Sequence, residues 1–288
     1  MLPPFQTQSN KCDGDLPPDS VLFGRSDVMQ NLRRRLSRVC ATSVPVVLQG
    51  EMCVGKSVLC RFIHEHSKAS SARFLKLNCS SFSDWGEHVS LSVALKSSVA
   101  APAPAGADNA VPAIGTLFLN EVCDLPRERQ QELSHLLADY DWTNIRDQQQ
   151  EAIRILCTSS RDLRRQVKQG RFRRDLFDLL TVVTIEVPPL RKRLVDLPVI
   201  IEYLHRRYSE QPGADHIDFS PDLLAKMLTY SWPGNFCELE SFVRRHVALK
   251  GDYSTQLHQA QRATGGGIWD WDGVAEPKSA AKATNRKM

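Results

Sequence analysis

The chain has 288 residues, 42% of them hydrophobic and 24% charged, a length and composition ordinary for a soluble globular protein of one or two domains with a sizeable core. Its formal net charge of +4 is too small to indicate nucleic-acid binding by itself. No apolar run is long enough to cross a membrane, and residues 1–15 lack the basic and apolar segments of a signal peptide.

The cysteines do not predict a metal site. None of the eight forms a Cys-x-x-Cys pair, which argues against zinc. Cys60 and Cys157 lie inside apolar runs, as buried free thiols do. We therefore expect a reducing, cytoplasmic location.

The chain opens with a segment that does not predict a packed core. Residues 1–20 are rich in Pro, Asp and Ser and are predicted to form a flexible leader. Residues 27–39 then show helical spacing of apolar side chains, and the opposite face carries an arginine run, Arg33, Arg34, Arg35 and Arg38. Such a run most often marks a solvated helix face, and a DNA-binding face is the alternative.

Residues 50–57 carry the pattern Gly-x-x-x-x-Gly-Lys-Ser of a phosphate-binding loop. An apolar run at 44–48 precedes it and predicts a buried strand, and helical spacing follows it. In such a loop, backbone N–H groups and the helix N-terminus bind phosphate oxygens, the lysine neutralises the β- and γ-phosphates, and the serine holds Mg²⁺. The predicted nucleotide-binding residues are Gly50, Glu51, Met52, Cys53, Val54, Gly55, Lys56 and Ser57, with Ser57 also the predicted Mg²⁺ ligand.

After this loop, strand and helix patterns alternate, which predicts an α/β fold with a parallel sheet. Residues 80–98 are weakly helical, and the Ala-Pro segment at 99–113 is predicted to be a mobile loop. The predicted strands are 74–79, 115–121, 153–158 and 182–187, and the predicted helices are 127–139 and 161–169.

From residue 188 the pattern changes to helices alone. We predict an α/β subdomain at 21–187, a helical subdomain at 188–250 and a flexible tail at 251–288. Ser220 before Pro221 reads as a helix N-cap with proline at the first helical position. Trp269 and Trp271 in the tail either dock on a surface or are exposed. The helices of the second subdomain are predicted at 196–208, 221–230 and 235–250.

Several motifs occur in the order found in one protein family. In chain order they are residues 23–26, the phosphate loop at 50–57, and residues 62–67, 77–79, 115–121, 171–176, 188–193 and 232–235. From about Leu22 to Lys250 the chain resembles the AAA+ domain of bacterial sigma-54-dependent transcriptional activators. The resemblance implies a P-loop NTPase fold with a helical lid and a ring of subunits that bind ATP between them. It also implies hydrolysis that remodels sigma-54 RNA polymerase.

The resemblance also assigns roles to single residues. Glu121 is similar to the acidic residue that polarises the attacking water, and Asn78 to the asparagine that hydrogen-bonds this glutamate. Arg173 is similar to an arginine finger, which reaches a neighbour's nucleotide and stabilises charge on the γ-phosphoryl group.

The sequence also departs from the family pattern. The aspartate that supports Mg²⁺ is replaced by Asn120, and an amide has no charge to offer the ion. A second arginine falls on Leu179, a sensor asparagine on Ser160, and the lid arginine on Cys237. The sigma-54-contacting sequence Gly-Ala-Phe-Thr-Gly-Ala is absent, and the Ala-Pro segment takes its place.

The resemblance and its departures together predict an ATP-binding protein of transcription regulation with impaired hydrolysis and impaired sigma-54 remodelling. Its expected partners are its own copies or a related activator in a ring, with a possible contact to RNA polymerase. Residues after Lys250 are too few and too Gly-rich for a helix-turn-helix, which argues against direct DNA binding. An active AAA+ ATPase with another target and a nucleotide-gated scaffold are the alternatives.

Overall fold

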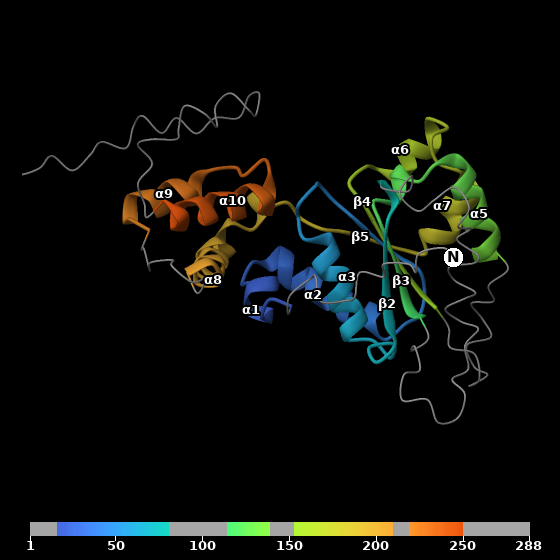
Figure 1. Cartoon of the computed structure of the whole chain (residues 1–288), viewed down its shortest axis with the longest axis horizontal. Helices are drawn as coiled ribbons and strands as arrows, with labels where there is room; N and C mark the ends of the chain where they lie inside the picture. The colour runs from blue at the N-terminus through green and yellow to red at the C-terminus, as the bar shows by residue number, and fades with distance from the viewer. Residues whose placement is uncertain (1–15, 81–113, 139–152, 210–218, 250–288) are drawn as a thin grey trace, which may run out of the picture.

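The computed structural model describes residues 16–80, 114–138, 153–209 and 219–249. Its centre is a five-stranded parallel sheet in the order β2-β3-β4-β1-β5 (Figure 1). The strand that precedes the phosphate loop, β1, lies between β4 and β5, so the loop leaves the sheet where the strand order reverses. The strands are β1 Val46–Gln49, β2 Arg73–Asn78, β3 Ile114–Asn120, β4 Arg154–Ser159 and β5 Val183–Glu186.

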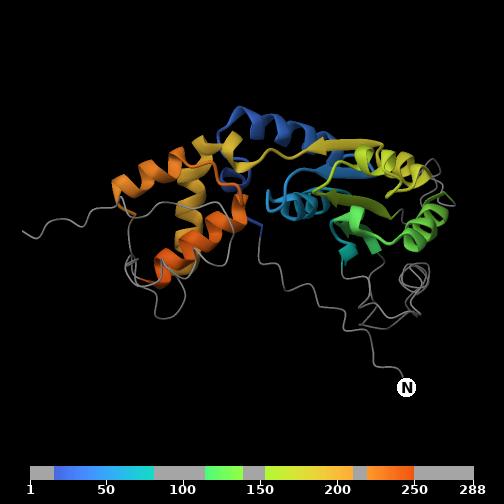
Figure 2. The ribbon, with the colours of Figure 1, turned by 90° about the horizontal axis from the view of Figure 1, so that it is seen from above.

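Helices cover both faces of the sheet, as the apolar runs of its strands require. The first face packs against α2 and α3, and the second against α5, α6 and α7 (Figure 2). These helices are α2 Asp27–Cys40, α3 Lys56–Glu65, α5 Arg127–Ala138, α6 Leu163–Lys168 and α7 Arg174–Leu180, with the short α1 Asp19–Leu22 before them and the 3-10 turn Val122–Asp124 after β3.

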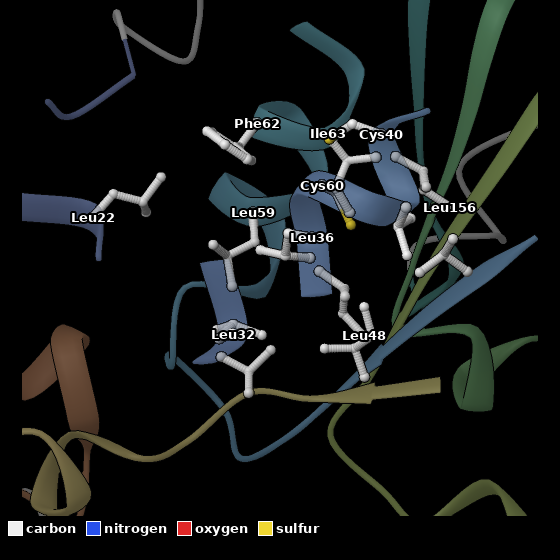
Figure 3. Close-up of a cluster of buried hydrophobic side chains, with 14 of the residues drawn as sticks. Leu22, Leu32, Leu36, Cys40, Leu48, Leu59, Cys60, Phe62, Ile63 and Leu156 are labelled. Carbon is white, nitrogen blue, oxygen red and sulfur yellow. The ribbon is translucent and has the colours of Figure 1, made fainter. Parts of the chain in front are cut away.

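Side chains on β1 alternate between the two cores, as the two-residue period of a strand dictates. Val46 and Leu48 pack with α2 and α3, and Val47 packs with α5 and α7 on the opposite face. Figure 3 shows Leu48 among Leu32, Leu36 and Leu59 of the first core. Burial on both faces holds β1, and with it the start of the phosphate loop, inside the sheet.

The helices after β5 form a separate layer around Trp232, which is fully buried and donates from Nε1 to the Met227 carbonyl at 3.0 Å. Ser220 caps the helix of this layer that begins at Pro221, and its hydroxyl accepts from the Leu223 N–H at 3.3 Å, as predicted. The elements are the 3-10 turns Leu190–Lys192 and Leu194–Asp196, and the helices α8 Leu197–Ser209, α9 Pro221–Thr229 and α10 Asn235–Ala248.

A buried carboxylate joins this layer to the start of the chain. Asp196 accepts from the Ser26 N–H at 2.8 Å and from the Ser26 hydroxyl at 2.6 Å, and pairs with the Arg193 guanidinium at 3.2 Å. Gly24 has φ +56°, and a Cβ there would lie 2.2 Å from the Asp196 carboxyl carbon. The motif at residues 23–26 therefore serves to receive this carboxylate.

The predicted α/β architecture with a parallel sheet and a helical layer is confirmed. Two of the described helices were not predicted: α7, which begins inside the motif at 171–176 and continues beyond it, and α1, whose first two residues fall in the predicted leader. Residues 1–15, most of 80–98, the Ala-Pro segment and the tail with Trp269 and Trp271 lie outside the described residues. None of the described helices combines the length and apolar character that a membrane crossing needs.

Candidate functional site

The phosphate loop connects β1 to α3 through backbone conformations that match its glycines. Gly55 has φ +93°, which favours glycine, and its carbonyl accepts the first bond of α3 from Leu59 at 3.1 Å. A Cβ at Gly50 would lie 2.7 Å from the Val187 carbonyl oxygen. Cys53 adopts φ +59° without being glycine, which is a strained position held by the surrounding structure.

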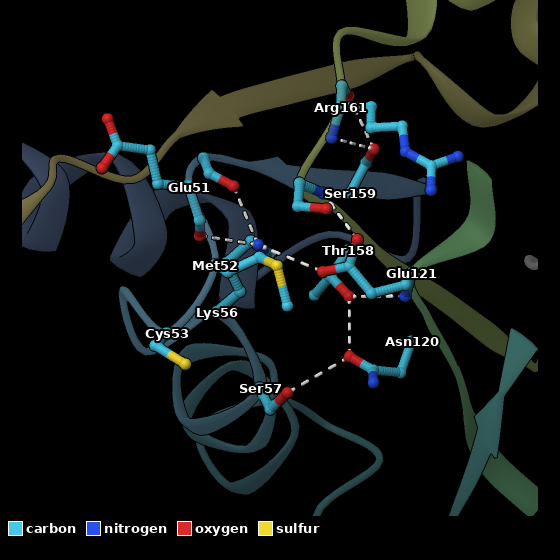
Figure 4. Close-up of polar contacts among 12 residues, drawn as sticks. Glu51, Met52, Cys53, Lys56, Ser57, Asn120, Glu121, Thr158, Ser159 and Arg161 are labelled. Atoms are coloured by element: carbon cyan, nitrogen blue, oxygen red, sulfur yellow. Dashed lines mark hydrogen bonds and ion pairs between the residues drawn. The ribbon is translucent and has the colours of Figure 1, made fainter. Parts of the chain in front are cut away.

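Lys56 is the buried cation at the centre of the loop. Its side chain is 6% exposed, and Nζ donates to the carbonyls of Gly50 at 2.8 Å and Glu51 at 2.9 Å (Figure 4). It also pairs with Glu121 Oε1 at 3.1 Å. One ammonium group therefore holds the loop in shape and contacts the carboxylate at the end of β3.

Polar side chains at the ends of β3 and β4 form a network beside Ser57. Asn120 Oδ1 accepts from the hydroxyls of Thr158 at 2.9 Å and Ser57 at 3.3 Å, as the dashed lines in Figure 4 show. Asn120 Nδ2 donates to Asn78 Oδ1 at 3.4 Å. The structure thus brings Asn78 next to Asn120, and Asn120 in turn contacts Ser57 of the phosphate loop.

Glu121 is positioned by its backbone and by its carboxylate. Its φ of +55° turns the chain sharply after β3, and its N–H donates to Thr158 Oγ1 at 3.0 Å. Oε2 accepts from the Ser160 N–H at 2.7 Å, while Oε1 faces Lys56. The contacts described for this carboxylate are therefore with Lys56 and Ser160, and Asn78 lies beside Asn120.

The other side of the loop meets the helical layer through a disulfide between Cys53 and Cys237. The Phe236 N–H donates to the Cys53 carbonyl at 3.0 Å next to it. A reducing location favours free thiols, and the sequence predicted no bond between these two residues. Their positions are 184 residues apart, so no local pattern could reveal the bond.

Glu51 and Asn235 complete this seam. Glu51 makes two hydrogen bonds to the Arg191 guanidinium, at 2.6 and 2.9 Å, and these bonds, with one from Asn235, lower the pKa of Glu51 to about 2. The buried Asn235 donates to Glu51 Oε2 and the Met52 carbonyl, both at 3.1 Å, and accepts from the Leu190 N–H at 2.9 Å. Arg191 and Asn235 lie in the motifs at 188–193 and 232–235, but nothing in these short stretches predicts a role at the site.

Arg173 lies in a different part of the described chain from the loop contacts. Its guanidinium pairs with Asp175 at 2.6 Å, and its N–H donates to Gln130 Oε1 of α5 at 2.9 Å. The carboxylate raises the pKa of Arg173 through a hydrogen bond, which keeps the cation charged. Its described contacts therefore come from α5 and α7, and the structure does not bring it to Lys56.

The site offers oxygen donors suited to one divalent cation beside a phosphate. The Ser57 hydroxyl and the Asn120 amide oxygen lie 3.3 Å apart, and neutral oxygens of this kind are ligands that Mg²⁺ accepts. Within the described residues, no group of three His, Cys, Asp or Glu side chains could hold a metal ion. Two neutral oxygens would leave most of the octahedral shell of Mg²⁺ to phosphate oxygens and water.

Comparison with protein families decides the classification. The model of the sigma-54 interaction domain matches residues 22–186, and that of the AAA+ ATPase lid domain matches residues 191–263. The chain belongs to the sigma-54 activator family of AAA+ proteins. The phosphate loop lies in the first matched domain and Cys237 in the lid, so the disulfide joins the two domains.

Curated members of this family align with most of the chain. The response regulator protein PilR of Pseudomonas aeruginosa is 32% identical over 86% of this chain and 57% of its own length. The DNA-binding transcriptional regulator NtrC of Azospirillum brasilense is 33% identical over 84% of this chain and 50% of its own. The chain thus spans about half the length of the curated relatives it matches.

Solved structures of the family share the fold. NtrX from Brucella abortus in complex with ADP superposes with a TM-score of 0.64 at 26% identity, covering 83% of this chain and 53% of that one. The same protein in complex with ATP gives a TM-score of 0.62 at 27% identity, covering 80% and 50%. The predicted fold class, an AAA+ P-loop NTPase with a helical lid, is confirmed for this family member.

Proposed function

We propose that this chain binds ATP or ADP at residues 50–57 and acts in transcription regulation as a subunit of the sigma-54 activator type. The observation that carries the proposal is Lys56, whose buried ammonium lies at the loop carbonyls and against Glu121. A γ-phosphate gives this cation a stronger partner than a carbonyl does. The relatives bound to ADP and ATP support the same assignment.

Magnesium would accompany the nucleotide at Ser57 and Asn120. The ion supplies charge neutralisation on the β- and γ-phosphates when it is bound. The Asn120 amide oxygen already accepts hydrogen bonds from Ser57 and Thr158, so magnesium would compete with these two hydroxyls for it. The amide also brings no negative charge to the ion. We expect this replacement of the family aspartate to weaken magnesium-dependent steps.

Hydrolysis by this chain should be slow. Glu121 keeps the position of the residue that would polarise water, and Arg173 that of the finger directed at a neighbouring subunit. Leu179, Ser160 and Cys237 stand where the family has other groups, and an arginine finger alone is worth roughly 10³-fold or more in rate. Because Arg173 contacts α5 and α7 of its own chain, a finger role requires a neighbour, and we propose a ring of this chain or of this chain with a related activator.

Remodelling of sigma-54 polymerase should be impaired as well, because the family's contact sequence Gly-Ala-Phe-Thr-Gly-Ala is replaced by the Ala-Pro segment. The chain would then tune transcription in the cytoplasm through partner subunits or RNA polymerase.

The test is a titration of the purified protein with a fluorescent ATP analogue, followed by phosphate release with Mg²⁺. We expect binding that weakens at least about 100-fold in Lys56→Ala, since a charge-assisted contact to phosphate is lost. Arg61→Ala, which removes a half-buried cation of the same helix that pairs with Glu65, is the matched control and should bind normally. Absence of binding in the wild type refutes the proposal.

Turnover separates the alternatives. Little phosphate release, unchanged in Glu121→Gln, supports the slow subunit. Clear release that Glu121→Gln abolishes supports an active AAA+ ATPase with another target. Co-purification with RNA polymerase or a related activator supports a role in transcription, and its consistent absence leaves the nucleotide-gated scaffold.

A further inference from the structure

The disulfide lies where the nucleotide and the lid would communicate. Cys53 is inside the phosphate loop, and Cys237 is in the first turn of α10, the lid helix that begins at Asn235. A nucleotide held by residues 50–57 would therefore lie beside a covalent bond between the loop and the lid. In the resemblance described above, residue 237 is the position of the lid arginine, so a sulfur bonded to the loop stands in place of a cation.

The two bonded sulfurs are open to small reagents. Cys237 is exposed and Cys53 is half-buried. The free cysteines of the described ranges differ from them, because burial raises the pKa of Cys79 to about 12 and also raises the pKa of each of the others, Cys40, Cys60, Cys123 and Cys157. A thiol with a raised pKa has little reactive thiolate near neutral pH. Thiol exchange within the described chain is thereby directed to the pair of Cys53 and Cys237.

Contacts beside the disulfide keep the two residues together without it. The Phe236 N–H bonds the Cys53 carbonyl, and the Asn235 amide bonds the Met52 carbonyl on the residue before it. The Cα atoms of the two cysteines are 5.6 Å apart. After reduction these neutral contacts still hold the thiols near each other, so re-oxidation is an intramolecular step with a high effective concentration.

We propose that the Cys53–Cys237 disulfide is a reversible redox latch that closes the lid on the phosphate loop and traps bound nucleotide. In the oxidised protein the loop and lid stay joined, and nucleotide leaves slowly. In the reduced protein the described contacts that remain across the seam are hydrogen bonds and the exposed pair of Glu51 with Arg191, and water competes with this ion pair. The inference rests on the proposed nucleotide binding and adds a way in which nucleotide release is regulated.

The chemistry of the latch is a thiol–disulfide exchange. A thiolate of a small dithiol attacks Sγ of Cys237, the Sγ–Sγ bond breaks, and Cys53 leaves as a thiolate that takes up a proton. The second thiol of the reagent loses its proton and attacks the reagent's own sulfur, which releases Cys237 as a thiol. The dithiol becomes a disulfide, and the protein gains two electrons and two protons. A small-molecule disulfide such as oxidised glutathione drives the reverse reaction.

The test loads the reduced full chain with a fluorescent ADP analogue, oxidises half of the sample with oxidised glutathione, and chases both halves with unlabelled ADP. Mass spectrometry of peptides reports the Cys53–Cys237 bond in each half. We expect release at least about tenfold slower in the oxidised wild type and its recovery on adding dithiothreitol. Cys237→Ser should release at the reduced rate under both conditions.

Cys123→Ser removes a free thiol of the α/β subdomain, and Cys12→Ser changes a cysteine that lies outside the described residues; both controls should keep the full response. The wild-type comparison needs no variant, so a misfolded mutant does not decide the outcome. Equal or faster release after oxidation, or failure of the Cys53–Cys237 disulfide to form, overturns the latch while nucleotide binding stands. A reduced protein that binds no nucleotide overturns the proposed function and the latch together.

Discussion

The phosphate loop has two sides that are held by different kinds of interaction. On the strand side, Lys56 pairs with Glu121 and Ser57 donates to Asn120, which also accepts from Thr158, through buried or half-buried polar contacts. On the lid side, the loop meets a disulfide, one buried amide and an ion pair whose partners are 42% and 44% exposed. The strand side could neutralise phosphate charge, and the lid side joins the loop to the helical layer.

The difference shows which positions tolerate replacement. A buried polar group that loses its partner costs free energy, so a change on the strand side must leave every donor and acceptor satisfied. Asn120 meets this condition, because its oxygen accepts two hydroxyls and its nitrogen donates to Asn78. At the lid seam water can satisfy an exposed group, and Cys237 could replace a different side chain without such a constraint.

The largest expected effect of breaking the lid side comes from Asn235→Ala. The change removes three hydrogen bonds of a side chain that is 1% exposed and places alanine at φ +49°. We expect a loss of about 2–4 kcal/mol of unfolding free energy, measured by urea denaturation of the reduced protein. Asn235→Gly is the matched control, because glycine accepts this backbone and isolates the hydrogen-bond part. A stability equal to that of the wild type would contradict the role of this amide.

The strand side is tested by Thr158→Val, which keeps the shape and removes the hydroxyl. Thr158 is fully buried, donates to Asn120 and accepts from the Glu121 N–H, so the variant leaves both groups without this partner. We expect a loss of about 1–3 kcal/mol in the same assay and weaker binding of the fluorescent analogue. Thr158→Ser restores the hydroxyl and should recover most of the binding. If valine and serine variants bind alike, the hydroxyl does not organise the site.

The smallest expected effect is that of Glu51→Gln on the exposed ion pair. The pKa of Glu51 is held at about 2, below its ordinary 4.5, so its contribution to stability is present above pH 4.5 and is lost as the pH falls towards 2. We expect a Tm lower by no more than about 2 °C at pH 7, with the difference from wild type closing between pH 4.5 and 2. Arg191→Gln should give the same profile, and the double variant should add little. A Tm difference that persists at pH 2 would show that the effect does not come from the Glu51 charge.

Much of the strand side was predictable because its signals are local. The pattern at residues 50–57, the apolar strand before it and the polar residues ending the strand at 120–121 each lie within a few positions of one another. The carboxyl ends of parallel strands meet at one edge of a sheet, so Asn78 and Asn120 could be expected near the loop. The roles of Glu121 and Arg173, which came from the family resemblance, stay predictions for the assays above. Helix α7 was missed because its seven residues follow directly on a short turn and give too little period to recognise.

By itself, the sequence determined the α/β class, the phosphate loop and the change to helices after residue 188, because glycines, apolar periods and caps act over one or two turns. Only the tertiary structure decided how the lid meets the loop. Cys53, Cys237 and Asn235 carry no local signal for one another, and the disulfide spans 184 residues. Their contact depends on where the carboxylate of Asp196 and the core around Trp232 place α10, which is a property of packing and not of any short stretch of sequence.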